Sequence, residues 1–177
     1  MFKPDEFKFG VGIPQIFWAE GTWRLGPKKS QKGDSGIVPV GVLLTNKKHG
    51  CCIDVAWEMD VRTIFRFERH GNVNQQWCLY HRPDGAIVII SKLTGKCMDI
   101  QGYRSDDGAP VQQWDYLGNT NQLWTLEPLE DHSFRIRSKH SGKVLDMCPH
   151  PLADGGAVVQ WEWHGGDNQR WWITHAT

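Results

Sequence analysis

Apolar and polar residues alternate in short runs along most of this chain. Ile87 and Ile89 alternate with their neighbours, and so do Phe134 and Ile136. A spacing of two residues is typical of a half-buried strand, and the turn-forming sequence Pro83-Asp84-Gly85 stands just before the first of these runs. We find no convincing apolar period of 3.6 residues. The pattern therefore predicts an all-β protein of short strands with essentially no α-helix.

One short motif recurs three times at a constant interval. Its copies are Asn-Gln-x-Trp sequences that end at Trp77, Trp124 and Trp171, 47 residues apart in both cases. Asp99 and Asp146, which lie upstream of the second and third copies, are also 47 residues apart. Equal intervals of this size indicate one supersecondary unit repeated three times. Because no helices separate the strands, such a unit closes most naturally into a barrel capped by hairpins, which leaves no free sheet edge.

Three features together carry a resemblance to a known family. They are the Gln-x-Trp copies, the runs Gly95–Asp99 and Gly142–Asp146, and the segments Asp107–Trp114 and Asp154–Trp161. In these features the chain resembles the ricin B-type lectin family. The resemblance implies a β-trefoil of three ~47-residue repeats with about twelve short strands. It also implies that each motif Trp fills the shared core while the motif Gln ties adjacent backbone together. We expect residues 40–177 to form this domain and residues 1–39 to form an N-terminal extension.

A saccharide site needs oriented hydrogen-bond acceptors for vicinal hydroxyls, an aromatic plate for the apolar face of the sugar, and an amide. Each repeat offers such a set at spacings similar to those of the family. The third repeat offers Asp146, Trp161, His164, Asn168 and Gln169. The second offers Asp99, Gln112, Trp114, Asn121 and Gln122, with Leu117 in place of the His. The first, which departs most from the pattern, offers Asp54, Phe67, His70, Asn74 and Gln75.

Two questions about these residues stay open at the level of sequence. The repeat Asp and Asn residues also suit a purely structural role, since both cap turns through their side chains. Tyr116 and Trp163 stand two residues beyond the stacking aromatic, so on a strand they share its face. They either widen the platform or pack beneath a neighbouring loop.

The resemblance favours a non-catalytic lectin that binds glycans of the galactose or N-acetylgalactosamine type, or other glycans, through shallow sites in the second and third repeats. The main alternative is a protein-binding trefoil, such as a protease inhibitor or a cytoskeletal binder, whose repeats serve only the fold. A further alternative is the targeting part of a toxin. We expect no catalytic residues and no cofactor, because no motif pairs two carboxylates across a cleft and there is no Gly-x-Ser-x-Gly, His-Glu-x-x-His or phosphate-binding loop.

The net charge and the lengths of the apolar segments indicate which classes of partner this chain is suited to bind. The formal net charge is 0 and the pI is about 7.1, so nothing favours nucleic acid or an anionic membrane. The run Ala86–Ile90 is of strand length and far too short to span a membrane. The segment Met1–Phe7 has acidic residues and no apolar core, so it does not resemble a signal peptide.

The cysteines support the same view of the compartment. Many secreted members of the family join the Cys before the repeat Asp to a second Cys, but Arg69 and Tyr116 stand at that second position here. We therefore expect Cys52 and Cys97 to be reduced and buried, and the protein to be cytoplasmic, with any release independent of a signal peptide. We expect no metal site, because Cys51 and Cys52 point to opposite faces of a strand and no further ligand motif accompanies them.

The first forty residues do not fit the repeat. Phe7, Phe9, Val11 and Ile13 alternate as in a strand, and the polar stretch 27–36 is typical of a loop or linker. We expect this segment to be an arm that packs on the outside of the trefoil. The alternative is an element for homo-oligomerisation or for docking a partner.

Overall fold

The computed structural model describes residues 16–19, 22–25, 41–56, 62–148 and 158–176. In the N-terminal segment it describes β1 (Ile16–Ala19) and β2 (Thr22–Leu25), which pair as an antiparallel hairpin. The strand expected over Phe7–Ile13 and the linker expected over 27–36 lie outside the described residues. No helix in the described ranges is long and apolar enough to cross a membrane.

The remaining strands fall into three groups of four, one for each repeat. The first repeat consists of β3 (Val42–Asn46), β4 (Cys52–Val55), β5 (Ile64–Phe67) and β6 (Trp77–His81). The second consists of β7 (Ile87–Ser91), β8 (Cys97–Ile100), β9 (Val111–Trp114) and β10 (Trp124–Pro128). The third consists of β11 (Phe134–Ser138), β12 (Val144–Met147), β13 (Val158–Trp161) and β14 (Trp171–His175). The short 3₁₀ turns are η1 (Val73–Gln75), η2 (Gln101–Tyr103), η3 (Thr120–Gln122) and η4 (Asp167–Gln169).

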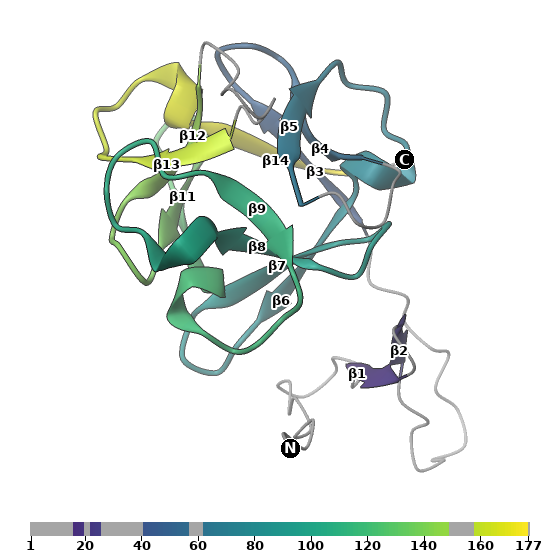
Figure 1. Cartoon of the computed structure of the whole chain (residues 1–177). Helices are drawn as coiled ribbons and strands as arrows, with labels where there is room; N and C mark the ends of the chain where they lie inside the picture. Colours follow the sequence, from purple (N-terminus) through teal and green to yellow (C-terminus); the bar gives the residue numbers. More distant parts are fainter. Residues whose placement is uncertain (1–15, 20–21, 26–40, 57–61, 149–157, 177) are drawn as a thin grey trace.

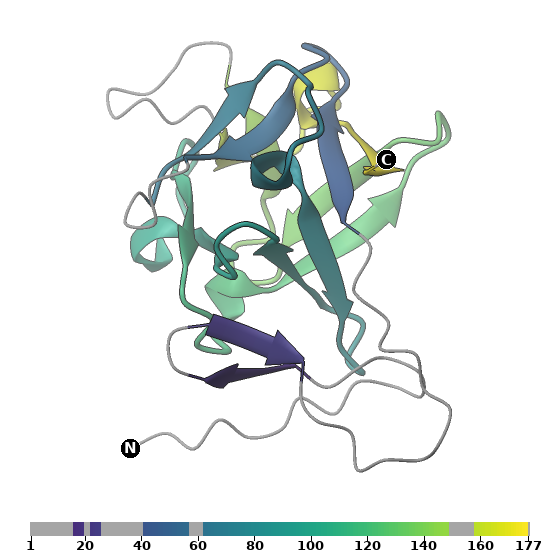
Figure 2. The same cartoon turned by 90° about the vertical axis from the view of Figure 1, so that its right-hand side faces the viewer.

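Six of these strands close into a barrel. Strand β3 pairs with β6, β6 with β7, β7 with β10, β10 with β11, β11 with β14, and β14 returns to β3. The other six form the hairpins β4–β5, β8–β9 and β12–β13 (Figure 1). Isolated bridges join neighbouring hairpins at Thr63–Gln112 and Pro110–Val159. Figure 2 shows the same arrangement from a second direction. The predicted β-trefoil, with twelve strands in three repeats, is confirmed.

The three motif tryptophans form the centre of the core, as predicted. Trp77, Trp124 and Trp171 have no exposed surface. Each indole N–H donates a hydrogen bond to a backbone carbonyl, at 3.2 Å, 3.3 Å and 3.0 Å respectively. A buried Trp needs a partner for its N–H, so these bonds let the largest side chain of each repeat lie in the apolar interior without an unsatisfied donor.

A network of four charged side chains joins the end of β3 to the β10–β11 turn and to η4. Lys47, just after β3, lies 2.9 Å from Asp131 of the β10–β11 turn and 3.0 Å from Asp167 of η4. Arg170 contacts the same Asp131 carboxylate at 3.1 Å. Hydrogen bonds from Ser133 and Lys47 hold the pKa of Asp131 well below its usual range. The first and third repeats are thus joined by charge as well as by the β14–β3 pairing.

Each of the five cysteines, all in the described part of the chain, is a free thiol. Cys52 and Cys97 are buried, as expected, and so is Cys78. Burial raises the pKa of all three thiols, so they stay protonated and unreactive at neutral pH.

Replacing the core residue Trp171 should reduce the free energy of unfolding far more than replacing the exposed Trp172 beside it. Trp171→Ala should reduce the free energy of unfolding by about 3–5 kcal/mol, because it empties a large buried volume. Trp172→Ala is the matched control: the next residue on the same strand is 40% exposed, and its loss should cost less than about 1 kcal/mol. Denaturation with urea measures both values, and equal losses would contradict the assignment of Trp171 to the core.

Asp131→Asn should lower the melting temperature at neutral pH. The folded pKa of Asp131 is depressed, so its contribution to stability is fully present above the unfolded value, about 3.9, and is lost as the pH falls through the folded value. The difference in melting temperature between variant and wild type should therefore shrink at acidic pH. Asp115→Asn is the control, since that side chain is 74% exposed and its nearest cation is 3.9 Å away. A difference that grows on acidification would show that the network is not what stabilises this junction.

Candidate functional site

The third repeat places its predicted site residues on the β12–β13 hairpin and the turn η4 that follows it. Asp146 lies near the end of β12, Trp161 ends β13, and Asn168 lies in η4. Asn168 Nδ2 donates to Asp146 Oδ2 at 2.8 Å. No described residue donates a hydrogen bond to the other carboxylate oxygen, Asp146 Oδ1. Trp161 is 42% exposed. Asp146 pairs with Val159, two residues before Trp161, so the acceptor oxygen and the aromatic ring lie on the same face of the hairpin.

His164 completes this set with a defined orientation. The backbone N–H of Gly166 donates to His164 Nδ1 at 3.3 Å, so the ring hydrogen is on Nε2. That nitrogen faces Asp146 Oδ2 at 3.7 Å, which is too long for a hydrogen bond. A Cβ on Gly166 would lie 2.5 Å from Asn168 Oδ1 and 2.6 Å from His164 Cε1. A side chain at position 166 would therefore displace the His164 ring or the Asn168 amide from its present position.

The motif glutamine of each repeat is fully buried and bonded at both ends of its amide. Gln169 Oε1 accepts from the backbone N–H of His164 at 2.9 Å, and Nε2 donates to the Glu162 carbonyl at 2.8 Å. Gln122 makes the equivalent bonds to Leu117 and Asp115, and Gln75 those to His70, Gly71 and Glu68. These side chains have no exposed surface, so their part in a site is to position its loop.

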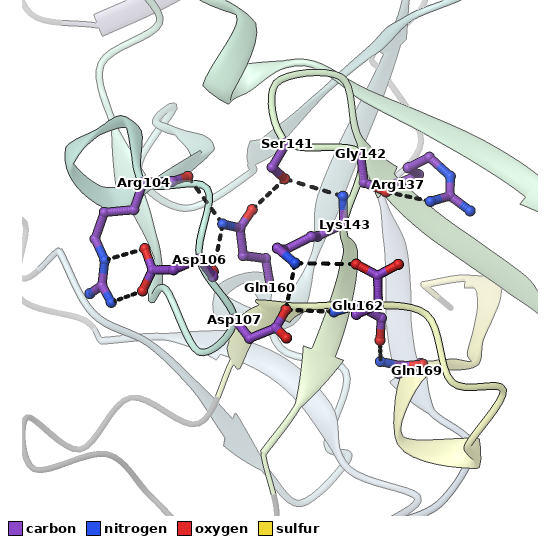
Figure 3. Close-up of polar contacts among 10 residues, drawn as sticks. All are labelled: Arg104, Asp106, Asp107, Arg137, Ser141, Gly142, Lys143, Gln160, Glu162 and Gln169. Carbon is purple, nitrogen blue, oxygen red and sulfur yellow. Dashed lines mark hydrogen bonds and ion pairs between the residues drawn. The ribbon is translucent and has the colours of Figure 1, made fainter.

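The loop between β8 and β9 of the second repeat holds the third-repeat site in place (Figure 3). Asp107 Oδ1 accepts a hydrogen bond from the backbone N–H of Glu162 at 2.8 Å. The Lys143 ammonium lies between the carboxylates of Asp107 and Glu162, at 2.7 Å and 3.3 Å respectively. A Cβ on Gly108 would lie 3.4 Å from Trp161 Cζ3, so this glycine packs directly against the aromatic plate. Trp161 is therefore supported by a neighbouring repeat.

Gln160 extends the same junction. Its Nε2 donates to the carbonyls of Arg104 and Asp106 at 3.1 Å and 3.0 Å, and its Oε1 accepts from Ser141 Oγ at 2.6 Å. Figure 3 shows this amide between the loop of the second repeat and the β11–β12 turn. The loop is thus anchored by an uncharged, buried contact as well as by the exposed ion pairs.

In the second repeat both carboxylate oxygens already accept hydrogen bonds from the protein. Asp99 Oδ1 accepts from Gln112 Nε2 at 2.9 Å, and Oδ2 accepts from Asn121 and Gln122 at 2.9 Å and 3.0 Å. Burial raises the pKa of Asp99, and the three amide donors offset part of that effect. A ligand hydroxyl would have to share these oxygens or displace the Gln112 amide, whereas in the third repeat no residue of the described ranges donates to Asp146 Oδ1.

The aromatic residue of the second repeat also differs from that of the third. The Arg62 guanidinium lies over the Trp114 ring, 3.8 Å from its centroid. Trp114 is only partly exposed, whereas Trp161 is exposed, so the aromatic ring of the second repeat offers less surface to a ligand. Leu117, which stands where the third repeat has His164, is exposed and offers no polar contact.

The first repeat assembles a similar but closed arrangement. Asp54 Oδ1 accepts from Asn74 at 2.6 Å, while Oδ2 accepts from Gln75 at 2.9 Å and faces His70 Nε2 at 3.3 Å. Phe67 is exposed and packs edge-on against His70, with ring centroids 5.7 Å apart. Both carboxylate oxygens are in use here, as in the second repeat.

Tyr116 and Trp163 pack against guanidinium groups. Arg82 Nη1 donates to the Tyr116 hydroxyl at 3.1 Å. Arg135 and Arg170 lie over the half-buried Trp163 ring, 4.7 Å and 5.7 Å from its centroid. These contacts support the packing interpretation of the two residues.

Sequence reasoning missed Arg62, Asp107 and Lys143. Each acts on the site of a neighbouring repeat or across a junction between repeats. Asp107 and Lys143 lie in repeated segments, but the repeat pattern does not show these contacts between repeats. The 47-residue spacing aligns residues within a repeat and carries no information on which loop packs against which. Within the described residues, no group of three or more His, Cys, Asp or Glu side chains is placed to hold a metal ion.

Comparison with known proteins supports this architecture. Residues 19–114, 74–161 and 120–177 match the family model described as "Ricin-type beta-trefoil lectin domain-like". A search of curated proteins gives no match.

Solved structures give a similar result. ThreeFoil, a designed threefold-symmetric protein, is 32% identical over 76% of this chain and 97% of its own, with a TM-score of 0.71. The exo-β-1,3-galactanase 1,3Gal43A from Clostridium thermocellum is 29% identical over 80% of this chain and 32% of its own, with a TM-score of 0.70. The Macrolepiota procera ricin B-like lectin in complex with lactose is 24% identical over 78% of this chain and 98% of its own, with a TM-score of 0.62, and at that identity it shows the fold alone.

The Asp99 carboxyl should titrate above the ordinary aspartate value of about 3.9. Gln112→Leu should raise its pKa further, because the amide hydrogen bond that stabilises the charged form is lost. A carbon-detected NMR titration of the carboxyl groups measures both. A pKa that falls in the Gln112 variant would show that this bond does not form in solution.

Proposed function

Because this chain belongs to the ricin-type β-trefoil lectin domain-like family, we propose that it is a carbohydrate-binding protein whose principal site is in the third repeat. One observation carries the choice of repeat. Asp146 is the one repeat aspartate with an oxygen that no described residue occupies, and it lies in the same site as the exposed Trp161. A charged acceptor makes strong hydrogen bonds to ligand hydroxyls, and an exposed indole stacks on the apolar face of a sugar ring.

Each residue of the site has a distinct part in the proposed binding. Asp146 Oδ1 accepts hydrogen bonds from adjacent hydroxyls of the sugar. Trp161 stacks on the ring, and His164 Nε2 points its hydrogen into the site. Asn168 holds the carboxylate through Oδ2 and leaves Oδ1 for the ligand. Gln169 acts indirectly by fixing the backbone of His164.

The second repeat acts as a weaker, parallel site in this proposal. Its carboxylate is surrounded by three amides and one face of its aromatic ring is covered, so less of it is available to a ligand. Two weak sites on one rigid domain still increase avidity for branched or clustered glycans. A shallow site excludes little water, so we expect a Kd of about 0.1–1 mM for a monosaccharide at the third repeat.

We propose galactose-type sugars as the ligand class. The support is that the resembling family most often takes galactose or N-acetylgalactosamine. It is strengthened by one similar structure, which is named as an exo-β-1,3-galactanase.

We also propose that the domain is non-catalytic. This chain matches 32% of the galactanase, so an enzyme with a similar trefoil has most of its length elsewhere. A glycosidase flanks one bond with two carboxyl groups. Here each repeat aspartate is instead held by amide groups of its own repeat.

We also propose that the protein works in a reducing compartment, and its free thiols support this.

A glycan array followed by titration with the best hit tests this function, and variants locate the site. Trp161→Ala should weaken binding by roughly 1–2 kcal/mol through loss of the aromatic contact. Asp146→Asn, which keeps the shape but removes the charge, should weaken it about tenfold or more. Trp172→Ala is the control: it removes an equally exposed Trp on β14, outside the site, and should leave affinity unchanged.

Two results would contradict the proposal. An array without hits would favour the protein-binding trefoil. Glycan binding that survives Asp146→Ala and Asp99→Ala together would place the sugar elsewhere, at the first repeat or on the N-terminal segment.

A further inference from the structure

Tyr103 is an aromatic residue in a conformation that favours glycine. It ends η2 with a φ of 57°, and its side chain is exposed, at 47% of its full surface. A bulky residue in the left-handed region is strained, and such strain concentrates at binding sites. Core packing does not account for the ring, because nearly half of it faces solvent. Its position therefore points to a role outside the core.

His140, from the β11–β12 turn of the next repeat, supports this tyrosine. The two rings meet edge-on, with centroids 5.0 Å apart and planes at 88°. His140 Nε2 lies 2.9 Å from the Tyr103 carbonyl, and Nδ1 lies 3.4 Å from Thr120 Oγ1. A carbonyl only accepts, so Nε2 is the donor and Nδ1 accepts the Thr120 hydroxyl. The counterpart of His140 in the β7–β8 turn is Leu93, which packs against the core, so the fold does not require a polar ring here.

The Tyr103–His140 pair is continuous with the second-repeat site. Thr120, which contacts His140, is followed in η3 by Asn121. Asn121 Nδ2 donates both to Asp99 Oδ2 at 2.9 Å and to the Ile100 carbonyl at 3.1 Å, just before η2. The pair therefore borders the polar groups of this site.

The loop that carries Tyr103 is fixed on its far side as well. Gln160 Nε2 bonds the carbonyls of Arg104 and Asp106, and Arg104 pairs with Asp106 within the loop (Figure 3). An aromatic ring held in advance loses little conformational freedom when a ligand stacks on it.

We propose that the Tyr103–His140 pair forms a second subsite beside Asp99, so that the second repeat takes two consecutive sugar residues. The first sugar contacts Asp99 and Trp114, and the next one stacks on the exposed Tyr103 ring. This inference rests on the saccharide-binding function proposed above. In this proposal the two sites differ in the length of the ligand that they bind: the third repeat binds a single sugar, and the second repeat binds a disaccharide.

Galactose and lactose are the probes, used on the Asp146→Ala protein so that the second repeat is measured alone. Lactose should bind at least about fivefold more tightly than galactose. Tyr103→Gly should bring lactose down to the affinity of galactose and leave galactose unchanged, while Tyr103→Phe should keep the preference. Glycine suits a φ of 57°, so the relief of backbone strain offsets part of the lost contact with His140 and the Tyr103→Gly protein should stay folded. A melting curve of the variant, together with its unchanged affinity for galactose, shows that a loss of lactose binding does not come from unfolding.

The outcomes separate this inference from the proposed function. Equal affinities for galactose and lactose, or a preference for lactose that survives Tyr103→Gly, would overturn the second subsite and leave the third-repeat site intact. Binding by the wild type with none by the Asp146→Ala protein would overturn it too, because the second repeat would then not be a site. If the wild-type protein gave no hit on the glycan array, that result would contradict the proposed saccharide-binding function itself.

Discussion

The hydrogen bond from each buried motif tryptophan to the carbonyl just before the repeat aspartate is the contact on which the rest of the structure depends. Trp171 Nε1 donates to the carbonyl of Leu145, and the next residue is Asp146. The same relation holds in the other two repeats. The side chain that fills the core therefore also fixes the strand from which the carboxylate projects. Because strand and core are joined in this way, the carboxylate of each repeat has a fixed position relative to the core.

The three repeats share this framework and differ in what surrounds the carboxylate. In the third repeat one oxygen of Asp146 accepts no hydrogen bond from the described residues and the aromatic ring is exposed. In the second repeat amides bind both oxygens of Asp99 and a guanidinium covers one face of Trp114. The differences come from single residues, such as Gln112 where the third repeat has Val159. A threefold fold of this kind can thus hold sites of unequal strength and selectivity on one rigid body.

The regular features of this protein could be predicted from its sequence, and the features specific to each site could not. The 47-residue interval predicted a threefold all-β barrel, and the family resemblance of the repeated motifs predicted the trefoil and the core tryptophans, because those features follow from the repeated unit. The residues that the resemblance placed in each saccharide site stay predictions. The burial of the motif glutamines beneath the sites, the packing of Arg62 on Trp114 and the positive φ of Tyr103 did not follow from the repeated unit. They depend on how a loop of one repeat lies against the next, and pattern within a repeat says nothing about that contact.

NMR of the indole N–H groups during titration with the best-binding glycan tests the central claim most directly, since it observes the ten tryptophans at once. The account predicts that the Trp161 signal shifts first, that Trp114 follows at higher ligand concentration, and that the buried Trp77, Trp124 and Trp171 signals stay in place. Shifts confined to Trp172, or to indoles of the N-terminal segment, would contradict it, because the glycan would then bind outside the repeat sites.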